Sequence, residues 1–205
     1  LDDYLAIRPH QEQALRALVA QRRLAVGPWY VLPDEFLVSG EALIRNLMIG
    51  RHKATRFGPP VDVGYLPDSF GHIVQLPQIL RGFGITSAML SRGVGDEGET
   101  LGSEFWWEAL DGSRVLVVHQ VRGYCNGAAL GYPLPTVVFE GRDPDPDLAV
   151  GRVRRELELL TPYARAGVIL LNNGCDHLPP SPHLPRIIDH LRRAFPEVQW
   201  RWGTP

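Results

Sequence analysis

The stretch GYLPDSFGHIVQLPQILRGFGI, residues 64–85, joins an apolar run, a polar motif and an amphipathic segment. The run VDVGYL at 61–66 has the character of a buried strand, and residues 74–83 space their apolar side chains as a helix does. A second apolar run, ITSAML at 85–90, follows directly. We therefore predict a strand–helix–strand unit with Asp68 just beyond the first strand, where α/β proteins present side chains to ligands.

The rest of the chain continues this alternation. Helices are expected at 10–23, 39–57, 147–163 and 184–194, strands at 29–32, 168–172 and 198–202, a hairpin at 104–120, and loops at 94–102 and 123–146. The longer loop lacks periodicity and is expected to cover a site. Because helices and apolar strands alternate, we predict a parallel α/β architecture, and because no repeat or linker interrupts it, one domain over 1–205.

Composition excludes several classes of protein. With 205 residues, 44% apolar and 21% charged residues, the chain can build a sizeable core. Its net charge of −2 gives no basic surface for nucleic acid or an anionic membrane. No apolar run approaches the roughly 20 residues of a membrane span. The two cysteines, Cys125 and Cys175, are too few for a disulfide framework, so we interpret them as small buried side chains in a reducing, cytoplasmic setting.

Two carboxylates stand just beyond apolar strands, Asp68 after VDVGYL and Asp176 after VILLNNG. In a parallel sheet or barrel, both would emerge at the same face. Cleavage of a glycosidic bond needs such a pair, one nucleophile and one acid, held about 5–5.5 Å apart in a retaining enzyme. A helix cap at Asp68 and an ordinary loop position for Asp176 are the alternatives.

Four further residues are candidates for binding. Arg92 lies two residues after the strand-like run 85–90. It could clamp a hydroxyl or carboxylate, or form a surface ion pair. Tyr124 offers a flat ring for a sugar face, and His177 could orient a substrate hydroxyl. His72 could join a metal site, or pack and bond to the backbone. No HExxH, CxxC, GxSxG or Walker motif occurs, which leaves zinc-protease, serine-hydrolase and phosphate-loop chemistry without support.

The motif Pro-Asp-Ser-Phe-Gly-His within residues 64–85 closely resembles the nucleophile region of glycoside hydrolase family 38, the α-mannosidases. The resemblance extends to residues 27–47, 89–93 and 170–177, and so covers most of the chain. It implies an incomplete seven-stranded β/α barrel of the glycoside hydrolase and deacetylase type. It also implies a bound zinc ion and retaining hydrolysis of α-mannosides.

The resemblance assigns roles to individual residues. Asp68 matches the nucleophile, which is also a zinc ligand, and Asp176 matches the region of the acid/base. Arg92 matches an arginine that lines the sugar site, and Tyr124 matches, more loosely, a sugar-contacting tyrosine. The family's His-x-Asp pair, which supplies two zinc ligands, is absent from this chain. We therefore expect a partial catalytic domain, truncated at both ends and inactive alone, whose other zinc ligands lie outside it.

Two other functions remain open. A metal-dependent carbohydrate deacetylase on a similar barrel would use Asp68 as metal ligand and general base, and a sugar-binding module would bind without turnover. For the leading interpretation the partner is an α-mannoside or oligosaccharide substrate, with no nucleic acid and no membrane. Exposed edges of an incomplete barrel also favour a homo-oligomer.

Overall fold

The computed structural model describes residues 1–133 and 142–204, which divide into two compact units. The first unit holds residues 1–95, 105–118 and the C-terminal residues from Gly203, and the second holds 96–104 and 119–202. Each unit has its own hydrophobic core. A single domain over 1–205 stays a prediction.

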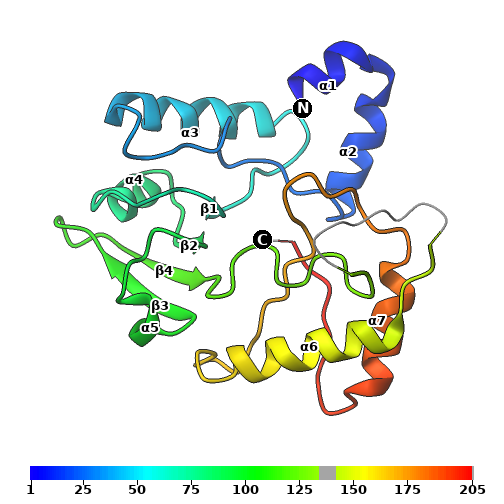
Figure 1. The fold of residues 1–205 in the computed structure, drawn as a ribbon. Helices are drawn as coiled ribbons and strands as arrows, with labels where there is room; N and C mark the ends of the chain where they lie inside the picture. Colours follow the sequence, from blue (N-terminus) through cyan, green and yellow to red (C-terminus); the bar gives the residue numbers. More distant parts are fainter. Residues whose placement is uncertain (134–141, 205) are drawn as a thin grey trace. The chain divides into compact units, whose positions relative to one another are not determined.

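A four-stranded sheet organises the first unit (Figure 1). Its strands are β1 (Val63–Leu66), β2 (Ser87–Leu90), β3 (Glu104–Glu108) and β4 (Arg114–His119), in the order β1-β2-β4-β3. β1 and β2 are parallel, with Leu66 opposite Leu90, and helix α4 (Leu76–Gly82) connects them. The predicted strand–helix–strand unit and the predicted hairpin of β3 and β4 are thus confirmed.

Four helical elements precede β1: α1 (Asp2–Ile7), the short 3-10 helix η1 (Pro9–Gln11), α2 (Glu12–Ala20) and α3 (Gly40–Ala54). The last two confirm the helices predicted within 10–23 and 39–57, whereas α1 was not predicted. The Ser39 side chain caps α3 by accepting a hydrogen bond from the backbone N–H of Ala42 at 3.2 Å. Leu43 and Leu47, one turn apart on this helix, are fully buried.

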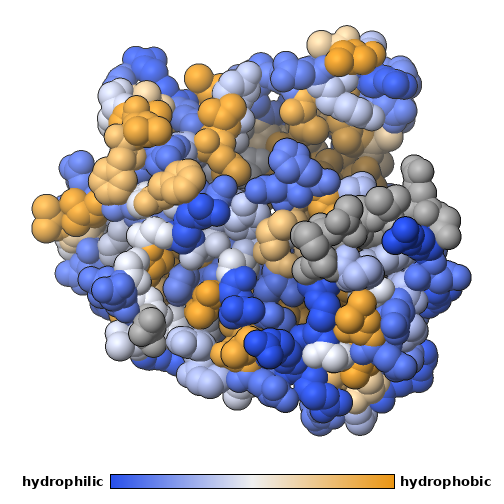
Figure 2. Space-filling view, viewed as in Figure 1, coloured by the Kyte–Doolittle hydropathy of each residue, from blue (hydrophilic) through white to orange (hydrophobic). Residues whose placement is uncertain are grey.

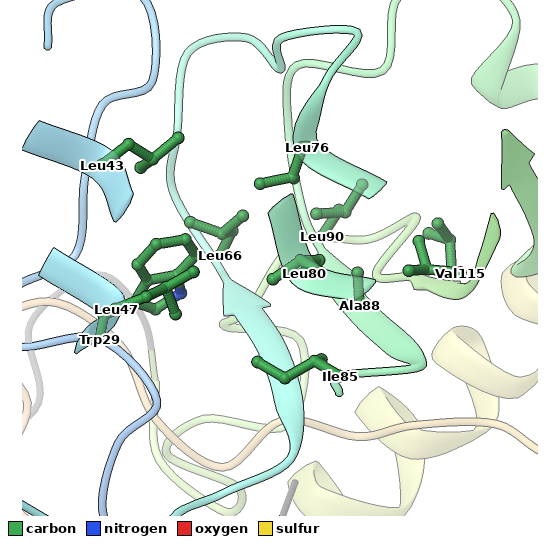
Figure 3. Packing of buried hydrophobic residues seen from close by; sticks show 11 residues of the cluster. Trp29, Leu43, Leu47, Leu66, Leu76, Leu80, Ile85, Ala88, Leu90 and Val115 are labelled. Carbon is green, nitrogen blue, oxygen red and sulfur yellow. The ribbon is translucent and has the colours of Figure 1, made fainter. Parts of the chain in front are cut away.

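The core of the first unit lies directly behind the ends of β1 and β2. Figure 3 shows Leu43 and Leu47 of α3 beside Leu66 of β1, and Leu80 of α4 beside Leu90 of β2. Burying one such side chain contributes about 1.5–3 kcal/mol to folding. The shared core therefore joins the two parallel strands to α3 and α4.

The predicted strand at 29–32 is not a strand in the structure. The side chain of Asn46 on α3 takes the place of a neighbouring strand. Its Oδ1 accepts from the N–H groups of Tyr30 and Val31 at 2.8 and 3.2 Å, and its Nδ2 donates to the Val31 carbonyl at 2.7 Å. The backbone is therefore satisfied without a sheet ladder.

Helices α6 (Pro146–Leu160) and α7 (Leu184–Ala194) form the core of the second unit. Asp145 caps α6 by accepting from the N–H groups of Asp147 and Leu148. Both helices confirm predictions. Helix α5 (Gly98–Leu101) is a single turn in a segment predicted as loop, so that prediction was wrong in part.

Two more predicted strands, 168–172 and 198–202, are not strands. Asn126 binds the first segment as Asn46 binds 29–32: its Nδ2 donates to the Leu170 carbonyl at 2.9 Å, and its Oδ1 accepts from the Asn172 N–H at 2.8 Å. In the second segment, the Trp200 ring packs against Phe195, with centroids 6.3 Å apart. Apolar pattern alone did not distinguish such packed, irregular segments from strands.

The α/β class is confirmed, with a mixed four-stranded sheet. Within residues 1–133 and 142–204 these strands do not close a barrel, so the seven-stranded barrel stays a prediction. Part of the predicted loop 123–146, residues 134–141, lies outside the described residues. In the described part of the chain, none of the helices is both long and apolar enough to cross a membrane.

The surface is not uniformly polar. Figure 2 shows apolar side chains at separate places among hydrophilic ones on one face of the molecule. Four apolar residues in the stretch from Val31 to the start of α3 are well exposed: Val31, Leu32, Phe36 and Leu37. This segment also contributes Glu35, which is buried.

Candidate active site

Asp68 and Arg92 are brought together by the register of the parallel strands. Asp68 stands two residues beyond Leu66, and Arg92 stands two residues beyond Leu90, its partner in the register. The Nη2 atom of Arg92 lies 2.6 Å from Oδ1 of Asp68. Two of the predicted site residues therefore meet at the end of β1 and β2.

The two oxygens of Asp68 differ in their surroundings. Oδ1 is sealed from solvent, although the side chain as a whole is 42% exposed, so its exposed surface belongs to the other side-chain atoms. The short contact with Arg92 lacks hydrogen-bond alignment, so charge rather than a directional bond holds the pair. The Arg92 guanidinium also lies over the exposed Phe70 ring, 4.9 Å from its centroid.

The alternative assignment of Asp68 as a helix cap is excluded. The next helix, α4, begins only at Leu76, and its N-cap is Gln75. Asp68 belongs instead to a turn whose next residue, Ser69, is buried and donates through Oγ to the Pro33 carbonyl at 2.8 Å.

A buried pair of ionisable side chains, Glu35 and His72, lies beside this turn. Their side chains are 0% and 5% exposed, and His72 Nδ1 lies 2.6 Å from Glu35 Oε1. The other ring nitrogen, Nε2, lies 2.9 Å from the backbone carbonyl oxygen of Arg92. Sequence reasoning missed Glu35, because Pro-Asp-Glu ahead of a helix resembles an ordinary exposed acidic turn.

Tyr124 and Asp176 form a second cluster, in the second unit. The Tyr124 hydroxyl lies 3.2 Å from both carboxylate oxygens of Asp176, to which it donates a hydrogen bond. Cys125 directly follows Tyr124, and Cys175 directly precedes Asp176. These two cysteines form a disulfide with a Cα–Cα distance of 4.9 Å. The interpretation of the cysteines as free, buried side chains was therefore wrong. Their separation of 50 residues gave no sign in the sequence that they meet.

The amide side chains beside this cluster hold its two loops together. Asn126 binds the backbone of Leu170 and Asn172, and the Gly127 N–H donates to the Asn172 carbonyl at 2.8 Å. The Gln120 side chain adds a hydrogen bond to Asn172 Oδ1 at 3.2 Å. The loops that carry Tyr124 and Asp176 are thus joined by polar contacts as well as by the disulfide.

The sequence profile described as "Glycosyl hydrolases family 38 N-terminal domain" matches residues 2–205, almost the whole chain. The chain belongs to glycosyl hydrolase family 38. Similarity to individual members agrees with this. The chain is 35% identical over 212 residues to "Putative mannosylglycerate hydrolase" of Halalkalibacterium halodurans, an alignment that covers 98% of this chain and 22% of that protein.

Two further relatives bear the name of α-mannosidase. Alpha-mannosidase 2C1 of Mus musculus is 39% identical over 94 residues, which cover 45% of this chain and 9% of that protein. The crystal structure of an α-mannosidase from Enterococcus faecalis superposes with a TM-score of 0.87 at 30% identity, covering 100% of this chain and 22% of that one. The chain spans about a fifth of the length of the Halalkalibacterium and Enterococcus proteins.

The resemblance to family 38 implies a bound zinc ion, but the described residues do not supply a complete set of ligands for it. In residues 1–133 and 142–204, no three or more His, Cys, Asp or Glu side chains gather in a way that could hold a metal ion. His72 is not available as a ligand, because Glu35 and the Arg92 carbonyl occupy both of its ring nitrogens. Asp68 alone would be one ligand of the several that a stable site needs.

His177 lies in the exposed loop immediately after Asp176. Its backbone φ is +57°, the left-handed region that only a few per cent of non-glycine residues adopt, with histidine enriched among them. Its role in substrate binding stays a prediction.

Proposed function

We propose that this chain is part of the catalytic domain of a retaining, zinc-dependent α-mannosidase that hydrolyses terminal α-mannosides. The observation that carries the proposal is the Asp68–Arg92 pair at matching ends of two parallel strands. The family assignment and the names of the relatives support the substrate class.

In the proposed first step, Asp68 attacks the anomeric carbon of the mannoside. Arg92 holds Oδ1 in the sealed part of the turn, which leaves Oδ2 as the oxygen that meets the substrate. Bond formation gives a covalent glycosyl-enzyme, while the leaving oxygen takes a proton from the second carboxylic acid.

Asp176 is our proposed donor of that proton. After the leaving group departs, the same carboxylate removes a proton from water, which then attacks the glycosyl-enzyme and regenerates both groups. The Tyr124 hydroxyl, bonded to both oxygens, would keep the carboxylate in one orientation between the two steps. A retaining mechanism requires the carboxyl groups of Asp68 and Asp176 to lie about 5–5.5 Å apart.

Zinc and the barrel belong to the same proposal. The metal, when bound, would hold sugar hydroxyls and polarise the site, and Asp68 would be one ligand, with the others supplied from outside the described residues. The four observed strands would form part of an incomplete seven-stranded β/α barrel.

The names of the relatives bear on the leaving group of the substrate. The name of the Halalkalibacterium protein indicates a mannoside whose leaving group is glycerate, and those of the other relatives indicate mannosides in general. We propose α-mannosides or mannose-containing oligosaccharides as the class, with mannosylglycerate as one member to test. The cytoplasmic location and a homo-oligomeric state stay predictions.

The test is hydrolysis of an aryl α-mannoside by the longest gene product that carries these residues, with and without a zinc chelator. Release of mannose that the chelator abolishes and added zinc restores supports the proposal. Mannosylglycerate, assayed in parallel, reports on the leaving group. Binding of mannose without turnover would favour a sugar-binding module, and release of acetate from an acetylated sugar would favour a deacetylase.

A further inference from the structure

The buried Glu35–His72 pair has no part in the chemistry proposed above, yet it is among the most enclosed polar groups described. Glu35 is 0% and His72 5% exposed at the side chain, and their contact is 2.6 Å. Buried ionisable groups are costly to folding unless they are fully bonded. The hydrogen bonds that satisfy this pair therefore connect it firmly to the segments around it.

The partners of the two ring nitrogens determine where His72 carries its protons. A carbonyl oxygen only accepts, so Nε2 must carry the hydrogen that it donates to Arg92, at 2.9 Å. One further proton lies between Nδ1 and Glu35 Oε1, on whichever atom holds it. Glu35 Oε2 accepts from the Ile73 N–H at 2.9 Å. Every polar atom of the pair is thus engaged, and neither residue is free for general acid–base work.

The pair joins three chain segments. Glu35 comes from the segment before α3, His72 from the turn after β1, and the accepting carbonyl from the residue after β2 and Ser91. Gly93 shows how closely the last two approach: a Cβ there would lie 2.9 Å from Gly71 Cα and 3.2 Å from His72 Cδ2. Trp107 closes the cluster with its ring edge-on to the imidazole, centroids 5.9 Å apart.

The carbonyl that His72 binds belongs to the same residue whose guanidinium meets Asp68. Arg92 is therefore held at its backbone by a buried hydrogen bond, while its half-exposed side chain reaches Asp68 by charge without a well-aligned bond. Because the side-chain contact is not directional, the hydrogen bond to the Arg92 carbonyl determines the backbone position from which the side chain extends toward Asp68.

We propose that Glu35 and His72 are positioning residues that fix the Arg92 backbone and thereby the orientation of Asp68. This inference rests on the proposed function, in which Asp68 is the nucleophile. A displacement of about 1 Å at a reacting group can lower a rate by about 100-fold, so loss of the backbone bond should appear in kcat.

Two substitutions of His72 separate positioning from packing. In His72→Gln the amide reaches where Nε2 lies and can donate to the Arg92 carbonyl, whereas in His72→Asn it overlies Nδ1 and keeps only the bond to Glu35. Both variants lose the ring and its contact with Trp107. We expect His72→Asn to lower kcat about 10- to 100-fold, and His72→Gln to retain most of it.

Glu35→Gln provides a rescue of the same kind. Its amide can accept from Ile73 and donate to Nδ1 of neutral His72, which preserves the geometry without the shared proton. We expect it to keep kcat within about threefold, while Glu35→Ala, which strands two buried polar groups, loses both activity and stability.

The experiment measures kcat, KM and thermal stability of these variants in the longest gene product that carries the residues, together with crystal structures of His72→Gln and His72→Asn. Support is a loss of kcat in His72→Asn alone, with Arg92 displaced from Asp68 in its structure. Equal losses in both, in step with falling stability, would overturn the inference. Displacement of Arg92 in a protein without glycosidase activity would retain positioning and reject the proposed function.

Discussion

The side chains of Asp68 and Arg92 meet at 2.6 Å because each lies two residues beyond one member of the paired Leu66 and Leu90. Their proximity is a consequence of strand register, and register is fixed by the buried face of the sheet. The sealed Oδ1 and the more open remainder of the Asp68 carboxylate follow from this arrangement.

Arg92→Ala should lower kcat/KM about 100-fold, because the Asp68 carboxylate loses the charge that holds Oδ1. Arg92→Lys should recover part of this, since it restores the charge but not the planar group over Phe70. Steady-state kinetics on an aryl α-mannoside measures both. Unchanged kinetics in Arg92→Ala would show that the pair is an ordinary surface contact.

Tyr124→Phe should lower kcat about 10-fold with little change in KM, because it removes the hydroxyl bonded to Asp176 and keeps the ring. Tyr132→Phe is the matched control, since its hydroxyl donates to the Arg142 carbonyl instead. We expect that control to affect stability and not kcat. A loss confined to KM in Tyr124→Phe would place the hydroxyl on the substrate rather than on Asp176.

The disulfide should contribute to both stability and catalysis. Replacing Cys125 and Cys175 by serine should lower the free energy of unfolding by about 2–4 kcal/mol, as measured by denaturant unfolding. It should also loosen the loops that bring Tyr124 to Asp176. Consequently, adding Tyr124→Phe to the serine variant should cost less kcat than in the wild type. Additive losses would show that the disulfide has no influence on this contact.

Asn46→Ala should destabilise the protein by about 1–3 kcal/mol, because three hydrogen bonds to the backbone of Tyr30 and Val31 disappear. Asn46→Asp keeps the acceptor for both N–H groups and loses only the donor. We therefore expect it to lower the melting temperature less than Asn46→Ala does. If the two variants unfolded at the same temperature, the two hydrogen bonds that Oδ1 accepts would not contribute to the support of this segment.

The sequence allowed prediction of the elements whose pattern is local. Helices α3 and α6 have side-chain caps, α3, α6 and α7 have apolar stripes, and the strand–helix–strand unit around Asp68 has both strand runs and a helical spacing. Parallel strands then bring Asp68 and Arg92 to one edge, as expected. The resemblance to family 38, carried by the same motif, was confirmed over residues 2–205.

What the sequence did not reveal depends on partners far along the chain. Segments 29–32 and 168–172 have the composition of strands, but Asn46 and Asn126 bind their backbones from 15 or more residues away. Burial of Glu35 and pairing of Cys125 with Cys175 likewise depend on segments that meet only in three dimensions. No pattern within a window of sequence reports such contacts.

We propose that Asp68 is the nucleophile of a retaining α-mannosidase. A fluorinated mannosyl fluoride tests it most directly, because its good leaving group allows the covalent glycosyl-enzyme to form while the ring fluorine slows its hydrolysis. Incubation with the longest gene product, digestion and mass spectrometry should find the mannosyl group on the peptide that contains Asp68, and not in Asp68→Asn. A label on another carboxylate, or an active enzyme that releases mannose with inverted configuration and forms no adduct, would contradict the claim.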